Sequence, residues 1–214
     1  MANSLYVSSP VNALVQGILR EDKTLAQILT HGNFGLGTFN DLDGEMVLID
    51  DVFSQLKSDG SVSKATLDIG SPYACVTHFN SIDPINLCSF ENYMDLQNFI
   101  FKKMLSPNLI YAIQIDGLFS SIHARSVPKQ HCYRPLADVA GDQVEFNFQS
   151  MAGQLVGYWT PNFMESITVP GFHLHFLSKD KLHGGHLLGC SLKSGTLWLQ
   201  PIDQLALDLP HSAE

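Results

Sequence analysis

The sequence predicts an α+β fold of mixed β-sheets with few helices. Most of the chain alternates apolar and polar residues with the period of a strand, and helical spacing appears only in short stretches. Helices and strands do not alternate regularly, which disfavours a doubly wound parallel sheet. We also expect a duplicated β-rich motif, because a glycine-led strand, GLGTF or GFHLHF, is followed in each half by a polar turn and a second strand.

Three segments have helical patterns. After Pro10, apolar residues from Val11 to Leu19 form one helical face, and a second short helix is expected to begin near Thr24. A third pattern spans residues 91–105, and Pro107 stops it. These elements are too few and too short to form a helical bundle, so they are expected to pack against sheets.

The remaining segments are predicted to be strands. A hairpin is expected to turn at Asp43-Gly44, another turn falls at Asp59-Gly60, and residues 130–142 are expected to form a loop. Further strands are expected at 74–79, 109–115, 118–127, 144–148, 154–159, 172–177, 186–192 and 196–201. We divide the chain into an N-terminal α/β half with a mixed sheet, residues 1–125, and a C-terminal β-rich half, residues 126–214, that carries the candidate metal ligands.

The charge of the chain disfavours two classes of partner. The 214 residues include 12 basic and 21 acidic side chains, a formal net charge of −9. Such a chain repels nucleic-acid phosphates and anionic membrane surfaces. A small anionic substrate is still compatible, because an arginine or a metal ion can reverse the potential locally.

The cysteines and the hydropathy pattern predict a cytoplasmic protein. Four cysteines are scattered without a CxxC pair, which predicts reduced structural thiols and neither a disulfide framework nor a thiolate zinc site. The N-terminal residues lack the basic region and uninterrupted apolar run of a secretion signal, and no apolar stretch reaches 18 residues.

The segment GFHLHFLSKDKLHGGHLLG, residues 171–189, contains the strongest chemical pattern. On a strand, His173 and His175 project from one face about 7 Å apart, and the following turn can bring His186 opposite them. Three neutral imidazoles with an open fourth position suit a catalytic zinc ion, and other divalent transition metals accept the same ligands. His183 competes as third ligand, although it precedes Gly184-Gly185 and so belongs in the turn. Surface histidines on a half-exposed strand are the alternative interpretation.

Two further polar residues are ambiguous when spacing alone is considered. Arg125 lies in a strand-like stretch, where a surface ion pair is the ordinary role. Glu45 begins a strand at the mouth of a turn, an ordinarily solvated position. The remaining histidines are isolated in sequence and are expected to be structural, with His123 favoured slightly for a direct role because Arg125 is nearby.

Three ordered runs carry a resemblance to a known family. GNFGLGTFNDLDGEM at 32–46, YAIQIDGLFSSIHARSV at 111–127 and GFHLHFLSKDKLHGGHLL at 171–188 resemble the signature blocks of bacterial α-acetolactate decarboxylases. The resemblance implies that the family's zinc ligands fall on His173, His175 and His186. It also places the site glutamate at Glu45, the site arginine at Arg125 and a pocket-lining threonine at Thr38.

The resemblance further implies a reaction and an assembly. Members convert (S)-2-acetolactate into (R)-acetoin and CO2 through a metal-bound enediolate, in acetoin and butanediol biosynthesis, without an organic cofactor. Arg125 would hold the departing carboxylate, and Glu45 would bind the metal or its water and help to manage the hydroxyl proton. Members are commonly homodimers, and we expect the same here.

The sequence departs from the family pattern at the C-terminus. Members usually continue past the position of Leu209-Pro210 into a tail that supplies another glutamate, whereas this sequence ends at Glu214. If that tail is missing, we expect weaker turnover or stereochemical control.

Two alternatives remain open. One is a non-catalytic metal-binding protein on the same fold. The other is a cupin-like metal oxygenase, which expects a glutamate three or four residues after the H-x-H, where Ser178 and Lys179 stand.

Overall fold

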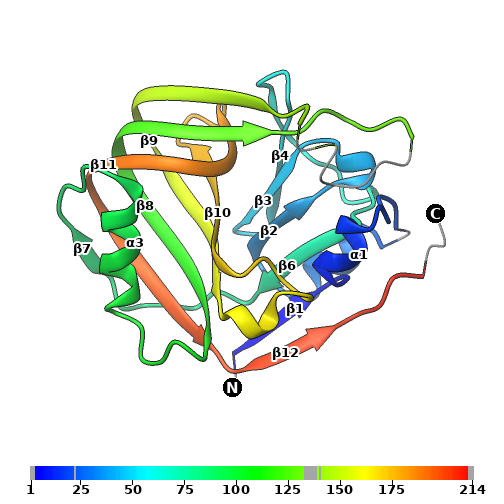
Figure 1. Cartoon of the computed structure of the whole chain (residues 1–214), viewed down its shortest axis with the longest axis horizontal. Helices are drawn as coiled ribbons and strands as arrows, with labels where there is room; N and C mark the ends of the chain where they lie inside the picture. The colour runs from blue at the N-terminus through cyan, green and yellow to red at the C-terminus, as the bar shows by residue number, and fades with distance from the viewer. Residues whose placement is uncertain (1–2, 22, 133–138, 140, 212–214) are drawn as a thin grey trace.

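Two β-sheets lie side by side and form the body of the molecule (Figure 1). A computed structural model of the chain describes residues 3–21, 23–132, 139 and 141–211. The predicted loop at 130–142 falls largely outside these residues, as does Glu214. Within them, strands far outnumber helices, as the sequence predicts. No helix in this described part combines the length and apolar character needed to cross a membrane.

The first sheet has seven strands, and at one edge the first strand of the chain pairs with the last. In order they are β12 (Gln204–Leu207), β1 (Ser4–Val7), β6 (Tyr73–Thr77), β2 (Phe34–Thr38), β3 (Glu45–Ile49), β4 (Val52–Leu56) and β5 (Val62–Lys64). Strand β12 runs parallel to β1, and all other pairs are antiparallel. The β2–β3 hairpin pairs Thr38 with Glu45, so these two residues lie opposite each other where the hairpin turns.

The second sheet has five strands, several of them long, and curls toward closure. In order they are β10 (Gly171–Ser178), β9 (Val144–Thr160), β8 (Ile110–Ser126), β11 (Gly184–Ile202) and β7 (Ile85–Leu87). Strand β10 also pairs with β11, which closes four of the strands into a ring around their own apolar core. The β10–β11 hairpin pairs His175 with His186, as the turn-rich sequence between them predicts.

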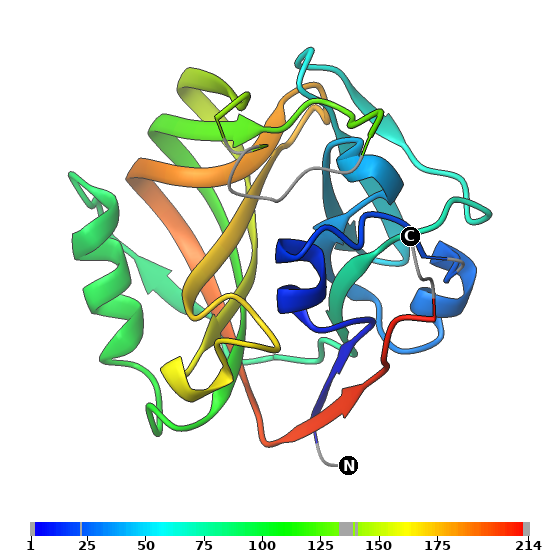
Figure 2. The ribbon, with the colours of Figure 1, turned by 45° about the vertical axis from the view of Figure 1, so that its right-hand side comes forward.

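The described helices are short and cover the sheets rather than forming a layer of their own. They are α1 (Val11–Val15), α2 (Leu25–Leu29), α3 (Tyr93–Phe101) and the single 3-10 turns η1 (Asn40–Leu42) and η2 (Asn162–Met164). Helix α2 begins at Thr24, whose hydroxyl accepts from the backbone N–H of Gln27 in a capping box. Helix α1 lies between the two sheets in the rotated view (Figure 2).

Several predicted boundaries are wrong. Asp116-Gly117 does not break a strand, because β8 continues through both residues. The glycine is needed there for close packing and not for a turn: an added Cβ at Gly117 would lie 2.7 Å from Leu192 of the neighbouring strand. Likewise, β9 and β11 are each one strand where the sequence indicated two. The first helix ends at Val15, because Gly17 adopts a φ of 95° that stops the helical pattern.

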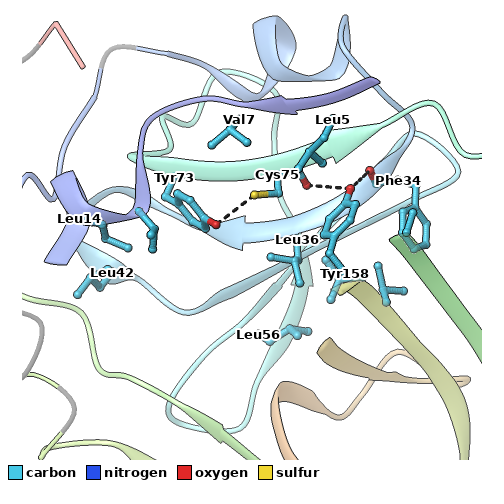
Figure 3. Packing of buried hydrophobic residues seen from close by; sticks show 14 of the residues in the cluster. Leu5, Val7, Leu14, Phe34, Leu36, Leu42, Leu56, Tyr73, Cys75 and Tyr158 are labelled. Atoms are coloured by element: carbon cyan, nitrogen blue, oxygen red, sulfur yellow. Dashed lines mark hydrogen bonds between the residues drawn. The ribbon is translucent and has the colours of Figure 1, made fainter. Parts of the chain in front are cut away.

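An apolar core and the buried hydrogen bonds of three side chains join the two sheets. Figure 3 shows part of this core, in which the hydroxyl of Tyr158 from the second sheet donates to carbonyls of the first sheet, at 3.2 Å for Phe34 and 3.3 Å for Cys75. The Ser126 hydroxyl donates to the Leu56 carbonyl at 2.9 Å, and the His175 ring bonds to the Met46 carbonyl at 2.8 Å. The division of the chain at residue 125 and the duplicated motif stay predictions.

The close approach of strands near the centre of the molecule predicts a stability effect. A Cβ added at Gly157 would lie 2.0 Å from the His173 carbonyl and 2.8 Å from Leu36 of the other sheet. We therefore expect Gly157→Ala to lower the free energy of unfolding by about 1–3 kcal/mol in denaturant titrations. Gly189→Ala is the matched control, because its Cβ would meet nothing closer than His123 at 3.9 Å. Equal stability of the two variants would contradict this account of the packing.

Candidate metal centre and substrate pocket

A cavity of about 250 Å³ between the two sheets is lined by the residues that the family resemblance places in the site. Thr38 and Glu45 reach it from the β2–β3 hairpin, and Arg125 reaches it from the end of β8. The three candidate metal ligands enter from the β10–β11 hairpin. They are His173, His175 and His186.

The three imidazoles form a compact cluster. One ring nitrogen from each residue can be chosen so that all three lie within 4.8 Å of one another, and the ring centroids are 5.0–5.3 Å apart. Two adjacent strands produce this arrangement, because residues 173 and 175 share a strand face and His186 is the register partner of His175. One ion can contact three nitrogens at this spacing.

The orientation of His175 supports metal binding. Its Nδ1 lies 2.8 Å from the Met46 carbonyl, which can only accept, so Nδ1 carries the proton and Nε2 presents a lone pair. Nε2 is buried and has no hydrogen-bond partner among the described residues. A buried nitrogen without a hydrogen-bond partner lowers the stability of the folded protein, and coordination to a metal ion would supply the missing partner. The donor set therefore fits a divalent transition metal.

Burial keeps the three imidazoles neutral. It lowers the pKa of His175 to about 4, with a smaller lowering by the Arg125 charge. Burial first, then neighbouring charges, also hold the pKa of His173 and of His186 well below the usual value. Neutral imidazoles are the form that binds metal, so protons compete weakly for these ligands near neutral pH.

Glu45 is buried and sits against the histidine cluster. Its side chain is 12% exposed, and Oε2 lies 3.4 Å from Nε2 of His175 without forming a hydrogen bond. Burial raises the pKa of Glu45 to about 7, although the Arg125 charge partly opposes this rise. The residue is thus not the solvated hairpin residue that its sequence context alone allowed. A carboxyl with this pKa can both release and accept a proton at neutral pH.

Arg125 supplies a positive charge to the cavity. It is half-buried, and its guanidinium forms no ion pair within 4.0 Å and no hydrogen bond with the residues that the structure describes. Its backbone is paired with His186 on one side and Glu145 on the other. The surface ion pair that spacing alone favoured is not seen in the described residues, and the guanidinium's donors remain available to a ligand.

Thr38 and Gln55 fix the turn that precedes Glu45. The Thr38 hydroxyl donates to the Gly44 carbonyl at 2.8 Å, and the Gln55 amide donates to the Asp43 carbonyl at 2.6 Å. Because its proton is already used, the Thr38 oxygen can only accept from a bound molecule.

Apolar side chains complete the wall of the cavity, and sequence patterns did not identify them. They are Val11, Leu14, Leu42, Tyr73, Val127 and Val169. Val11 and Leu14 belong to the apolar helical face that the sequence predicts, and Leu42 and Val127 lie within two of the runs that carry the resemblance, but no pattern marked any of the six as lining a cavity. Together they make one side of the cavity suited to small alkyl groups.

Two histidines that competed for roles lie elsewhere. His183 lies in the β10–β11 turn, where its ring packs 5.0 Å from that of Phe148. His123 is outside the cavity, and its Nε2 lies 2.7 Å from the Glu145 carboxylate on an exposed part of the sheet. Of the candidate third ligands, the structure therefore brings His186, and not His183, to the pair.

Asp41 joins the loops beside the cavity. Its carboxylate binds Arg20 and lies 3.4 Å from Lys129, while its backbone bonds to Leu19 and Gln130. The hydrogen bond from Arg20 is the main reason that the pKa of Asp41 is lowered. Its φ of 64° is a conformation that aspartate and asparagine tolerate.

Comparisons with known proteins point to one family. The family model for alpha-acetolactate decarboxylase matches residues 5–214. A protein of that name from Brevibacillus brevis is 38% identical over 211 residues, covering 98% of this chain and 74% of the relative. One from Raoultella terrigena is 41% identical over 210 residues, covering 96% and 80%. The crystal structure of the Bacillus subtilis strain 168 enzyme superposes with a TM-score of 0.95 at 34% identity, covering 98% of this chain and 90% of that one.

The histidine cluster predicts a specific pattern of metal loss. We expect His173→Ala, His175→Ala and His186→Ala each to weaken zinc binding by roughly 100-fold or more, since each removes a ligand rather than an outer partner. Zinc content after dialysis and titration calorimetry measure this. His183→Ala, from the same hairpin, should keep full affinity. If His183→Ala lost zinc and His186→Ala kept it, the third ligand would be His183 and not His186.

The charge of Asp41 predicts a pH-dependent contribution to stability. Because its folded-state pKa is depressed, the contribution is present above the unfolded value near 3.8 and is lost as pH falls through the lower folded value. Asp41→Asn should lower the free energy of unfolding by about 1 kcal/mol at pH 7, since the exposed Arg20 is screened by solvent. Denaturation at pH 7 and near pH 3 should show the difference shrinking in acid. A difference independent of pH would rule out the charge as its cause.

Proposed function

The chain belongs to the alpha-acetolactate decarboxylase family, and we propose that it converts (S)-2-acetolactate into (R)-acetoin and CO2 at the histidine cluster. The family is one of lyases, whose reaction turns acetolactate into acetoin and CO2. The reaction breaks the C1–C2 bond, releases C1 as CO2 and takes up one proton. The observation that carries the proposal is the meeting of three neutral imidazoles, a guanidinium without a partner among the described residues and a buried carboxyl in one cavity.

His173, His175 and His186 would hold zinc, the metal that three imidazoles most often bind in catalytic sites. When bound, the ion supplies Lewis acidity that draws electron density from the substrate's ketone and hydroxyl oxygens. The hydrogen bond from Nδ1 of His175 to Met46 fixes the tautomer in which Nε2 has a lone pair available to coordinate the ion.

Arg125 would bind the carboxylate that leaves as CO2. The substrate is an anion, the net charge of the chain is −9, and this guanidinium provides a local positive charge in the cavity. Two parallel N–H donors would orient the carboxylate and therefore the C1–C2 bond. Correct orientation lets the released electron pair pass to the adjacent ketone carbon.

Glu45 and Thr38 would handle the protons. With a pKa of about 7, Glu45 can take the proton of the substrate hydroxyl and return a proton after CO2 has left. The Thr38 hydroxyl donates to the Gly44 carbonyl, so its oxygen would act as an acceptor that orients the substrate hydroxyl before Glu45 takes the proton. The apolar wall would receive the substrate's two methyl groups and limit access of water.

Further properties follow from the family resemblance. We propose that the enzyme is a homodimer, that it works in the cytoplasm and that nucleic acids are not among its partners. The negative charge of the chain supports the last of these proposals, because it repels nucleic-acid phosphates. Sedimentation of the purified protein tests the dimer.

Acetoin formation from racemic acetolactate tests the function. Zinc-loaded protein should form acetoin faster than spontaneous decarboxylation, and chelated protein should not. Chiral chromatography should find the (R) product. Zinc binding without acetoin formation would contradict the proposal and favour a metal-binding protein without this activity.

Loss of the arginine gives a sharper prediction. We expect Arg125→Ala to lower kcat/KM by roughly 10²–10³-fold, because the carboxylate and the developing charge lose the one cationic side chain that lines the cavity among the described residues. Zinc content should be unchanged, since no ligand is altered. Lys193→Ala, an exposed cation on β11, is the control and should retain full activity. Unchanged kinetics in Arg125→Ala would remove this residue from the mechanism.

A further inference from the structure

Arg125 and Glu45 come from different sheets, so strand register cannot set the distance between them. Glu45 begins β3 in the first sheet, and Arg125 lies near the end of β8 in the second. Within a sheet, register specifies which residues are neighbours. Between sheets, only packing and hydrogen bonds can do so. A reaction that uses both groups on one substrate needs their spacing held closely.

One buried hydrogen bond connects the residue after Arg125 to the residue opposite Glu45. Ser126 is 0% exposed, and its hydroxyl donates to the Leu56 carbonyl at 2.9 Å. Leu56 ends β4 and is the register partner of Glu45 on β3. The path from Arg125 through Ser126 and Leu56 to Glu45 therefore links the cationic and the acidic group of the site.

Both ends of this hydrogen bond are held rigidly. A Cβ added at Gly44 would lie 2.6 Å from the Leu56 carbonyl oxygen, so the turn before Glu45 packs directly on that oxygen. At the other end, Ser126 and Arg125 are paired in the ladder with β9. Loss of the Ser126 hydroxyl would leave these local structures in place and remove the hydrogen bond between the sheets that lies nearest to both Arg125 and Glu45 in the chain.

We propose that Ser126 is a positioning residue that sets the separation of Arg125 and Glu45. It does not touch the substrate and acts through the Leu56 carbonyl. The inference rests on the proposed function, in which Arg125 binds the substrate carboxylate and Glu45 moves a proton. Its role is distinct from general stability, because the bond joins the sheets at the site itself.

Steady-state kinetics of Ser126→Ala separate positioning from stability. We expect KM for acetolactate to rise about tenfold with a fall in kcat, since a misplaced guanidinium binds the carboxylate poorly. Mere loss of folded enzyme would lower the apparent kcat and leave KM unchanged. Thr77→Val is the matched control: it removes a buried hydroxyl that donates to Ser4 at 2.7 Å, at the end of β6 away from Thr38 and Glu45. It should lose stability and keep KM within about twofold.

A double-mutant cycle tests whether Ser126 acts through Arg125. In an Arg125→Ala background, adding Ser126→Ala should change KM by less than about twofold, because the group being positioned is absent. An equal rise in KM in both backgrounds would overturn the proposal, as would a Ser126→Ala KM equal to that of Thr77→Val. If the unaltered protein forms no acetoin, the proposed function fails instead, so the two failures are distinguishable.

Discussion

The hydrogen bond between Nδ1 of His175 and the Met46 carbonyl is the contact on which the arrangement of the site depends. It belongs at once to the metal cluster and to the interface between the sheets. Because Nδ1 donates its proton to this carbonyl, the free lone pair of His175 is on Nε2, on the side of the other two imidazoles. By ending on Met46, it also places the cluster beside Glu45, the preceding residue of the same strand. Metal binding and sheet packing are therefore coupled through one imidazole.

The site is made where two hairpins face each other. The β10–β11 hairpin brings the three candidate metal ligands, and the β2–β3 hairpin brings Thr38 and Glu45. Each hairpin pairs its polar residues across neighbouring strands, so local register determines most of the geometry. What register leaves undetermined is the distance between the hairpins, and buried hydrogen bonds from His175, Tyr158 and Ser126 set it.

Residues that are close in sequence could be predicted to meet, whereas contacts across the interface could not. The H-x-H spacing and the glycine turn before His186 were enough to indicate a three-histidine cluster, because strand period and hairpin geometry are local properties. The expected strand breaks at Gly117 failed for a physical reason: this glycine accommodates Leu192 of the adjacent strand instead of making a turn. Glycine permits close packing as well as turning, and single-sequence patterns do not distinguish the two.

The same limit applies to side chains far apart in sequence. From spacing alone, Glu45 fitted a solvated turn and Arg125 a surface ion pair; only family resemblance placed them together. Tyr73 and the apolar residues of α1 line the cavity without any motif that marks them. Ser126 could not have been identified either, because its partner Leu56 is 70 positions away and the bond exists only once both sheets have formed.

The placement of all three candidate metal ligands on one hairpin has an evolutionary consequence. Strands β10 and β11 carry the histidines proposed to bind the ion, whereas the residues proposed to move protons come from β2 and β3. Substitutions in the β2–β3 hairpin could therefore change which proton is moved, or remove proton transfer altogether, while the imidazole cluster persists. A descendant could therefore keep the histidine cluster and acquire a new reaction through changes in the other hairpin alone.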